Sequence, residues 1–365
     1  MTKVFPTVAE VSAGRDNNLN LIRLLAASGV FIGHCWPLLY GLASHDPISS
    51  SIRPYSPFDR GIPGLCVYVF FFLSGFLVTR SMVTRNDLID YIVSRISRIY
   101  PALIVVVFLL VFLIGPAFTT VSTGEYFKNP LTWKYLLTNS LIWEVEFLLP
   151  GMFPDNVFIW VNGSLWTLPA ELRFYVLVAC LWALGVFTNR TVFNLVAVGL
   201  ALMGVIWRDV IWASALKGQI ELGLFFLAGA SLYMNRDLIR LTPLSFFSLI
   251  ILSVIFYDTA LYNLPVSLAM CFAVAYVAFA LPTLAPQANR FGDLSYGVYI
   301  YAYPVQQLVI HFMERNLGPW TLMVISTPII FILAGLSWFY IEKPALDLKT
   351  TLLSRRKKST RVLAE

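Results

Sequence analysis

Long apolar segments recur along almost the whole chain of 365 residues, and they constrain the fold more than any other feature. A helix needs about 20 mainly apolar residues to cross the hydrocarbon core of a bilayer. Segments of about that length lie at 19–41, 64–83, 99–118, 165–187, 191–208, 213–233, 243–258, 262–283, 294–314 and 319–341. Only 13% of the residues are charged, against roughly a quarter in soluble domains. We therefore expect an all-α, polytopic membrane protein with about ten transmembrane helices.

The segment 131–149 is a further apolar candidate, but it contains Lys134, Glu144 and Glu146. We therefore expect an interfacial or re-entrant element there. With ten crossings, the basic clusters fall on one side of the membrane: Arg80, Arg85, Arg95 and Arg98; Arg236 and Arg240; and Arg355, Arg356, Lys357 and Lys358. Basic residues favour the cytoplasmic side. This predicts cytoplasmic termini, with an N-terminal segment at 1–18, a transmembrane domain at 19–345 and a basic tail at 346–365.

The net charge of +6 would suggest nucleic acid in a soluble protein, but here the cytoplasmic loops explain it. We expect the lipid bilayer and no nucleic acid as a partner. The four cysteines stand singly without a C-x-x-C spacing, so we expect no metal site and no disulfide framework.

The first apolar segment carries two ionisable side chains, Arg23 and His34. They are separated by eleven residues, or roughly 16 Å along a helix at about 1.5 Å per residue. Ionisable groups within a bilayer are costly and often mark functional sites. A neutral histidine can act as a general base on a hydroxyl, or accept an acyl group as a nucleophile. The alternative is a core histidine that is hydrogen-bonded to a neighbour.

Further motifs follow this Arg-x10-His spacing in order along the chain. They are FFFLSGFL at 70–77, SRISRIYP at 94–101, GSLWTLPAE at 163–171, LSYG at 294–297 and YIEKP at 340–344. Together, over about residues 17–345, they resemble the acyltransferase 3 family of integral-membrane carbohydrate O-acyltransferases. The resemblance implies ten transmembrane helices and transfer of an acyl group, commonly acetyl, from coenzyme A to a sugar. Many relatives have a histidine where this chain has Ala302, so no role of that histidine is carried over.

Within this resemblance, Arg95 and Arg98 are candidates for holding the phosphates of acetyl-CoA, and Arg23 for supporting the donor channel. Arg95 and Arg98 are three residues apart, so they share a helix face. Guanidinium groups can grip a phosphate with two hydrogen bonds each. The alternative is ordinary positive charge on a cytoplasmic loop. Ser74 and Gly75, in the second span, suit a close approach between helices.

Glu171 lies near the outer end of the fourth span, at a depth comparable to that of His34. Its carboxylate can orient the histidine and stabilise its imidazolium, or bind sugar hydroxyls. The alternative is a structural carboxylate at a helix start.

Asn162, Ser164 and Trp166, just before Glu171, combine an indole with polar groups and suit a sugar. Tryptophan also serves as a simple anchor at membrane interfaces. Asp46, in the first outer loop, is a candidate for lining the acceptor entrance, and its alternative is a solvated loop residue.

These expectations combine in an O-acetyltransferase of the bacterial inner membrane, with His34 and Glu171 as its catalytic residues and no metal. Its acceptor would be a hydroxyl of a cell-surface glycan or of its lipid-linked precursor, such as the O-antigen of lipopolysaccharide or an exopolysaccharide. One alternative is a flippase or exporter of glycans or lipids, against which the lack of evident internal repeats argues. Another is O-acylation of a small-molecule glycoside.

Overall fold

The computed structural model describes residues 5–14, 17–206, 217–284, 286, 292–313 and 316–362. Within them the regular structure is helical, and extended chain pairs only at an isolated antiparallel bridge between Thr7 and Arg240. The prediction of an all-α protein is confirmed. Parts of the predicted N-terminal segment, of the predicted spans 191–208, 213–233 and 294–314, and of the predicted tail lie outside the described residues.

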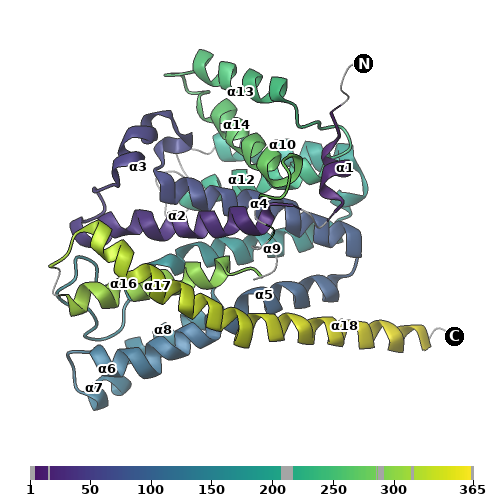
Figure 1. Cartoon of the computed structure of the whole chain (residues 1–365). Helices are drawn as coiled ribbons and strands as arrows, with labels where there is room; N and C mark the ends of the chain where they lie inside the picture. The colour runs from purple at the N-terminus through teal and green to yellow at the C-terminus, as the bar shows by residue number, and fades with distance from the viewer. Residues whose placement is uncertain are drawn as a thin grey trace. The chain divides into compact units, whose positions relative to one another are not determined.

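The chain forms two compact units, which we describe separately. The first comprises Met1–Gly33, His45–Thr84 and Phe174–Asp293. Its helices are α1 (Val8–Ser12), the first part of α2 (Leu19–Tyr40), α3 (Pro47–Ile52), α4 (Ile62–Arg85), most of α9 (Leu168–Ala183), α10 (Arg190–Ile206), α12 (Lys217–Met234), α13 (Pro243–Ile255) and α14 (Asn263–Ala275) (Figure 1).

The second unit comprises His34–Ser44, Arg85–Arg173 and Leu294–Glu365. It holds the end of α2, α5 (Leu88–Phe108), α6 (Gly115–Phe118), α7 (Thr123–Lys128), α8 (Pro130–Leu141), the start of α9, α16 (Ser295–Phe312), α17 (Pro319–Ser337) and α18 (Lys343–Val362). A π-helical turn, η7 (Trp338–Glu342), joins α17 to α18, so that the chain continues as one long helical run (Figure 1).

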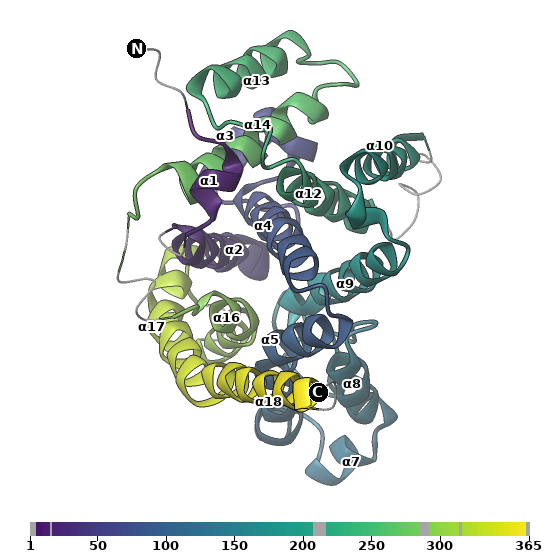
Figure 2. The same cartoon turned by 90° about the vertical axis from the view of Figure 1, so that its right-hand side faces the viewer.

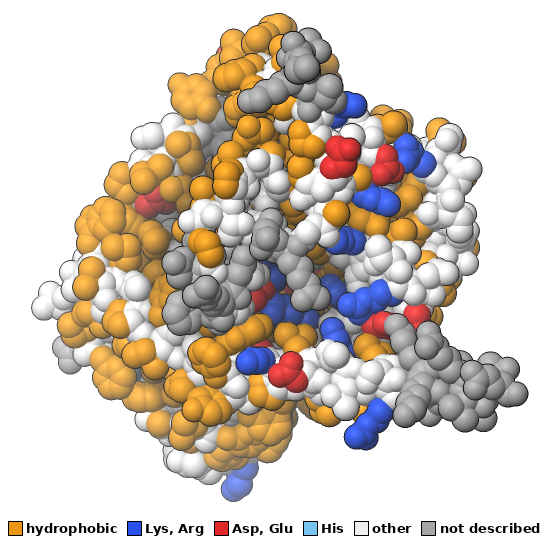
Figure 3. All heavy atoms as spheres, turned by 45° about the vertical axis from the view of Figure 1, so that its right-hand side comes forward, with side chains coloured by type: hydrophobic (Ala, Val, Ile, Leu, Met, Phe, Trp, Pro, Cys, Tyr) orange, Lys and Arg blue, Asp and Glu red, His pale blue; other side chains and the backbone are white. Residues whose placement is uncertain are grey.

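Six helical segments in the described part of the chain are long and apolar enough to cross a membrane. They are Leu19–Tyr40, Ile62–Arg85, Leu88–Phe118, Gly163–Ala183, Asn263–Ala280 and Pro319–Arg356. Three shorter apolar helices cover Arg190–Gly204, Gly218–Met234 and Pro243–Ile255. Large apolar side chains such as Leu195 and Val254 are exposed, and hydrophobic side chains cover much of the surface in Figure 3. This is a multi-pass membrane protein; ten crossings and cytoplasmic termini remain predictions.

The segment 131–149 contains a single helix, α8, of 12 residues. At about 1.5 Å per residue such a helix falls well short of a hydrocarbon core of about 30 Å. Lys134, within α8, forms an ion pair of 2.6 Å with Glu146, which follows the helix, and this pair raises the pKa of Lys134 above its usual range. Lys134 and Glu146, two of the three charged residues that argue against a transmembrane span here, therefore form an ion pair with each other.

Helices α4 and α12 of the first unit approach each other closely at two glycines. A Cβ atom on Gly75 would lie 1.9 Å from the carbonyl oxygen of Phe226, and one on Gly229 would lie 2.0 Å from that of Phe72. The prediction that Gly75 permits close helix approach is confirmed. Figure 2 shows the two helices side by side.

Replacing Gly75 with alanine should therefore lower the stability of the first unit. The new methyl group meets backbone rather than a flexible side chain, and overpacking of this kind costs roughly 1–3 kcal/mol. Gly199→Ala is the matched control, because no atom lies within 4 Å of a Cβ at that position. Thermal unfolding of the detergent-solubilised proteins measures the effect. Equal unfolding temperatures for the two variants would contradict the helix packing described here.

Candidate active site

His34 lies in the part of α2 that belongs to the second unit, and its ring packs against Tyr303 of α16. The ring centroids are 5.7 Å apart with an interplanar angle of 79°. The Nδ1 atom of His34 is buried and has no hydrogen-bond partner in the part of the chain that the structure describes. Buried polar atoms are nearly always paired, so an unpaired one needs an explanation. The alternative of a core histidine bonded through Nδ1 to a described neighbour therefore does not apply.

The Tyr303 ring also lies against the backbone at Gly163. A Cβ atom at this position would lie 2.5 Å from Cε2 of Tyr303. Only glycine lets the tyrosine ring lie so close to this backbone. Tyr303 thereby connects His34 with the segment around residues 162–167 that the sequence predicts to bind a sugar.

This segment is fastened to α16 by two further polar contacts. Asn162 donates from Nδ2 to the carbonyl oxygen of Ile300 at 3.0 Å, and its Oδ1 accepts from the backbone N–H of Ser164 at 3.2 Å. The hydroxyls of Thr167 and Tyr299 are 2.8 Å apart. Both ends of the Asn162 amide are thus engaged with the protein, which suits a residue that positions the segment.

Ser164 and Trp166 have groups available for a ligand. The Oγ atom of Ser164 is buried and has no hydrogen-bond partner among the described residues. The Trp166 side chain, by contrast, is 44% exposed. A buried hydroxyl and an exposed indole so close in sequence can serve the hydrogen bonds and the apolar face of a sugar ring.

One face of α16 organises these contacts. Tyr296, Tyr299, Tyr303 and Gln306 recur at intervals of three, four and three residues, and such residues share a helix face. Tyr296 donates from its hydroxyl to the carbonyl oxygen of Ile99 on α5 at 3.0 Å. At the other end, Gln306 donates from Nε2 to Sγ of Cys35, next to His34, at 3.1 Å. Sequence reasoning missed this face, although its periodicity was available as a signal.

Glu171 lies in the first turn of α9. Its carboxylate lies in the neighbourhood of Tyr299 on α16 and Tyr91 on α5. Tyr299 is one helical turn from Tyr303, which contacts His34. The structure thus brings Glu171 to the same face of α16 as the histidine, while a direct action of Glu171 on His34 remains a prediction.

The structure gives Arg98 a partner within the second unit. Its Nη1 lies 3.9 Å from Oε2 of Glu342, whose side chain is 2% exposed, and its guanidinium lies 5.9 Å from the Tyr296 ring centroid. Glu342 also accepts a hydrogen bond of 3.0 Å from the hydroxyl of Ser337. Arg95, the other predicted phosphate ligand, has its guanidinium 6.0 Å from the ring centroid of Tyr91.

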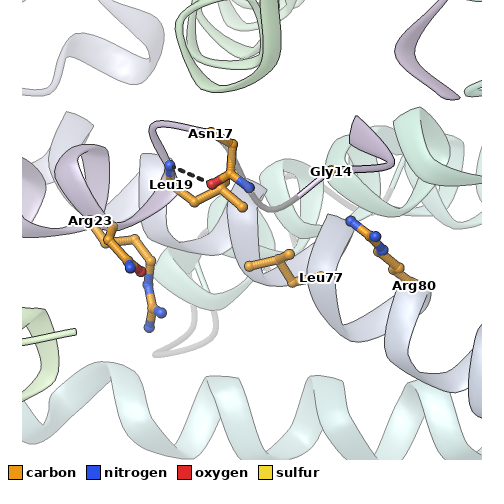
Figure 4. Close-up of a pocket in the computed structure, with 7 residues that line it drawn as sticks. Gly14, Asn17, Leu19, Arg23, Leu77 and Arg80 are labelled. Carbon is orange, nitrogen blue, oxygen red and sulfur yellow. Dashed lines mark hydrogen bonds between the residues drawn. The ribbon is translucent and has the colours of Figure 1, made fainter. Parts of the chain in front are cut away.

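Arg23 belongs to the first unit, where it forms an ion pair with Asp293. It also lines a cavity of about 400 Å³ with Arg80 and with Gly14, Asn17, Leu19, Asn20 and Leu77 (Figure 4). Arg80 donates from Nη1 to the carbonyl oxygen of Ser12 at 2.9 Å. Two guanidinium groups and two amides around one cavity suit an anionic or strongly polar ligand.

Asp46, the predicted residue of the acceptor entrance, caps helix α3. Its side-chain oxygen accepts a hydrogen bond of 2.8 Å from the backbone N–H of Ser49, and the residue is buried. The structure thus gives Asp46 a local structural role. No three His, Cys, Asp or Glu side chains gather into a possible metal site within the described ranges.

Comparison with known proteins assigns the chain to a family. The sequence profile of the acyltransferase 3 family, described as an acyltransferase domain, matches residues 16–339. An O-acetyl transferase of Shigella phage Sf6 is 30% identical over 357 residues, which cover 93% of this chain and 99% of the relative. Nodulation protein 10 of Rhizobium leguminosarum bv. viciae is 28% identical over 399 residues, covering 95% and 98%. No solved structure matches the chain. The prediction made from the motifs is confirmed: this multi-pass membrane enzyme is an acyltransferase and belongs to the acyltransferase 3 family.

Proposed function

We propose that the protein is an O-acetyltransferase that moves acetyl from acetyl-CoA to a hydroxyl of a cell-surface glycan or its lipid-linked precursor. The observation that carries this proposal is the buried Nδ1 of His34 beside Tyr303, which has no hydrogen-bond partner among the described residues. A base whose nitrogen is not engaged by these residues suits a reaction in which the substrate supplies the proton. The similarity to a protein named O-acetyl transferase supports acetyl as the group. Relatives from a Shigella phage and from Rhizobium support a bacterial membrane, which we take to be the inner membrane.

In the proposed reaction, neutral His34 takes the proton of the acceptor hydroxyl as the hydroxyl oxygen attacks the thioester carbonyl carbon. A new C–O bond forms and the C–S bond breaks. The sulfur of coenzyme A leaves with the electron pair of that bond and receives the proton from the imidazolium. The products are the acetyl ester and the free thiol, and His34 is neutral again. In the alternative route His34 is the nucleophile: a ring nitrogen attacks the thioester carbonyl carbon, a C–N bond forms, the C–S bond breaks, and the sulfur of coenzyme A takes the proton of the other ring nitrogen. The acceptor hydroxyl then attacks the acyl-histidine, a C–O bond forms as the C–N bond breaks, and the imidazole takes the proton of the hydroxyl.

The neighbouring residues take supporting roles in this proposal. Glu171 stabilises the positive charge that His34 gains in the transition state, through the polar face of α16. Ser164 and Trp166 contact the acceptor, while Asn162 holds the backbone on which they stand. Arg95 binds the donor. Arg98 faces Glu342 and supports the donor site through this structural contact.

His34→Ala should lower acetyl transfer from radiolabelled acetyl-CoA to the glycan by about 100-fold or more, the usual contribution of a general base. His311→Ala is the control, because this histidine lies on the same helix as Tyr303 but packs among the aromatic rings of Phe118, Phe153 and Phe312. Transfer by His34→Ala at the wild-type rate would rule out the proposed base. Glycan movement without any need for acetyl-CoA would favour a flippase instead.

Trp166→Ala should raise the KM for the acceptor roughly 3- to 10-fold, the effect of losing one aromatic contact of about 0.5–1.5 kcal/mol. The KM for acetyl-CoA should stay unchanged. Trp133→Ala is a matched control, since Trp133 is 43% exposed and Trp166 is 44% exposed. If both variants change the acceptor KM alike, Trp166 is only an interfacial anchor. Running the assay with glycan chains and with short glycosides separates the two acceptor classes.

A further inference from the structure

The tyrosines on one face of α16 differ in what their hydroxyl groups contact. The hydroxyl of Tyr296 donates to the carbonyl oxygen of Ile99 at 3.0 Å, and that of Tyr299 lies 2.8 Å from the hydroxyl of Thr167. Tyr303 follows on the same face and is only 5% exposed. Its hydroxyl, however, has no hydrogen-bond partner among the residues that the structure describes. Since buried polar groups are nearly always paired, this hydroxyl needs an explanation.

The hydroxyl end of the Tyr303 ring is held at Gly163. A Cβ atom at this glycine would lie 2.5 Å from Cε2, 2.7 Å from Cζ and 3.0 Å from the hydroxyl oxygen of Tyr303. A side chain at position 163 would therefore displace the phenol. Asn162 donates to the carbonyl oxygen of Ile300 at 3.0 Å and so fastens this backbone to α16 about one turn before Tyr303. The hydroxyl is thus positioned by packing against a fastened backbone.

Two further polar atoms without a described partner lie around the same phenol. The ring of His34 packs against that of Tyr303, with centroids 5.7 Å apart and an interplanar angle of 79°, and its Nδ1 is one of these atoms. The Oγ atom of Ser164, which directly follows Gly163, is the other. A base and two hydroxyls are therefore left without protein partners at one place in the second unit. A bound substrate that pairs with all three explains this better than three separate defects of packing.

Acyl transfer requires a hydrogen-bond donor at the acyl carbonyl. Attack on the carbonyl carbon places negative charge on the carbonyl oxygen, and fixed donors in a site that excludes water stabilise this oxyanion. Helix α16 is buried along almost its whole length and lies between α17 and α5 (Figure 2). The protein itself therefore has to supply the donor. A neutral phenol is a suitable one, because it donates without adding a charge to the interior.

We propose that Tyr303 is a catalytic residue, whose hydroxyl donates a hydrogen bond to the carbonyl oxygen of the acyl donor. This hydrogen bond strengthens as the acceptor hydroxyl attacks, His34 takes its proton and the carbonyl oxygen becomes an oxyanion. It weakens again when the C–S bond breaks and the carbonyl double bond forms anew. The proton of Tyr303 stays on the phenol oxygen throughout, so the residue is unchanged after each turnover. The role of Tyr303 rests on the proposed function, in which a thioester supplies this carbonyl.

The test is Tyr303→Phe, which keeps the ring against His34 and Gly163 and removes only the hydroxyl. The kcat for acetyl transfer from acetyl-CoA should fall about 100-fold or more, the usual loss for one oxyanion donor. The KM values for acetyl-CoA and for the glycan should stay unchanged, because the hydrogen bond is made mainly in the transition state. The unfolding temperature in detergent should not fall, since the substitution leaves no described group without a partner.

Tyr135→Phe is the matched control. Tyr135 lies in α8 of the same unit, and its buried hydroxyl also lacks a partner in the described part of the chain. Helix α8 carries none of the residues of the proposed site. This variant should keep the wild-type kcat. A loss of kcat equal to that of Tyr303→Phe would mean that removing any such hydroxyl disturbs the enzyme, and would overturn the role of Tyr303.

A second donor separates a contact with the carbonyl oxygen from an indirect effect on His34. In dithioacetyl-CoA, sulfur replaces this oxygen, and sulfur is a weak hydrogen-bond acceptor. Tyr303→Phe should therefore lower kcat much less with dithioacetyl-CoA than with acetyl-CoA. Equal losses with the two donors, an unchanged kcat with acetyl-CoA, or a change in the acceptor KM alone would each overturn the role of Tyr303.

Failure of the proposed function has a different signature, because the wild type would then transfer no acetyl from acetyl-CoA. The same two proteins are in that case compared with the acyl thioester that the wild type does use. A loss of kcat in Tyr303→Phe with that donor upholds the role of Tyr303, and an unchanged kcat refutes it. A wild type that uses no thioester at all refutes both proposals.

Discussion

A single buried face of α16 positions the chemistry of the second unit. From Tyr296 to Gln306 its polar side chains contact α5, the segment at 162–167 and the end of α2 that carries His34. Each of these contacts joins segments far apart in the sequence. In a membrane, polar groups that face inward must be satisfied by other parts of the protein. The contacts of Tyr296, Tyr299 and Gln306 therefore also hold the catalytic candidates in register.

The polar side chains around this face divide into two kinds. Arg356 with Asp87 is a pair whose geometry is complete without a ligand, because the guanidinium donates to both carboxylate oxygens. His34 and Ser164 instead have buried polar atoms without a described partner. Arrangements of the second kind destabilise the empty protein and become favourable only when a substrate supplies the missing partner. This distinction separates structural charges from candidate functional ones more sharply than charge type or sequence position does.

Much of the helical architecture could be predicted from the sequence, because apolar runs of membrane length leave few alternatives to a helix. The close approach of two helices at Gly75 could also be predicted from the local sequence, because small residues in a span permit close helix packing. The partners of individual charges could not be predicted in this way. Arg98 meets a carboxylate 244 positions further along the chain, and Arg356 meets one 269 positions before it. Asn162 and Asp46 have residue types that suit a sugar, yet their side chains serve the backbone. Helix α16 is also 18 residues long but does not meet the hydropathy of a span, because tyrosine and glutamine form its contacts.

The most direct measurement is a cryo-electron-microscopy structure of the inactive His34→Gln variant with acetyl-CoA bound. The donor phosphates should lie beside Arg95 of α5. The thioester should reach the polar face of α16 near Tyr303, within hydrogen-bonding distance of residue 34 or Ser164. Donor density elsewhere, with the thioester remote from Tyr303 and residue 34, would contradict the assignment of this face as the site of acyl transfer.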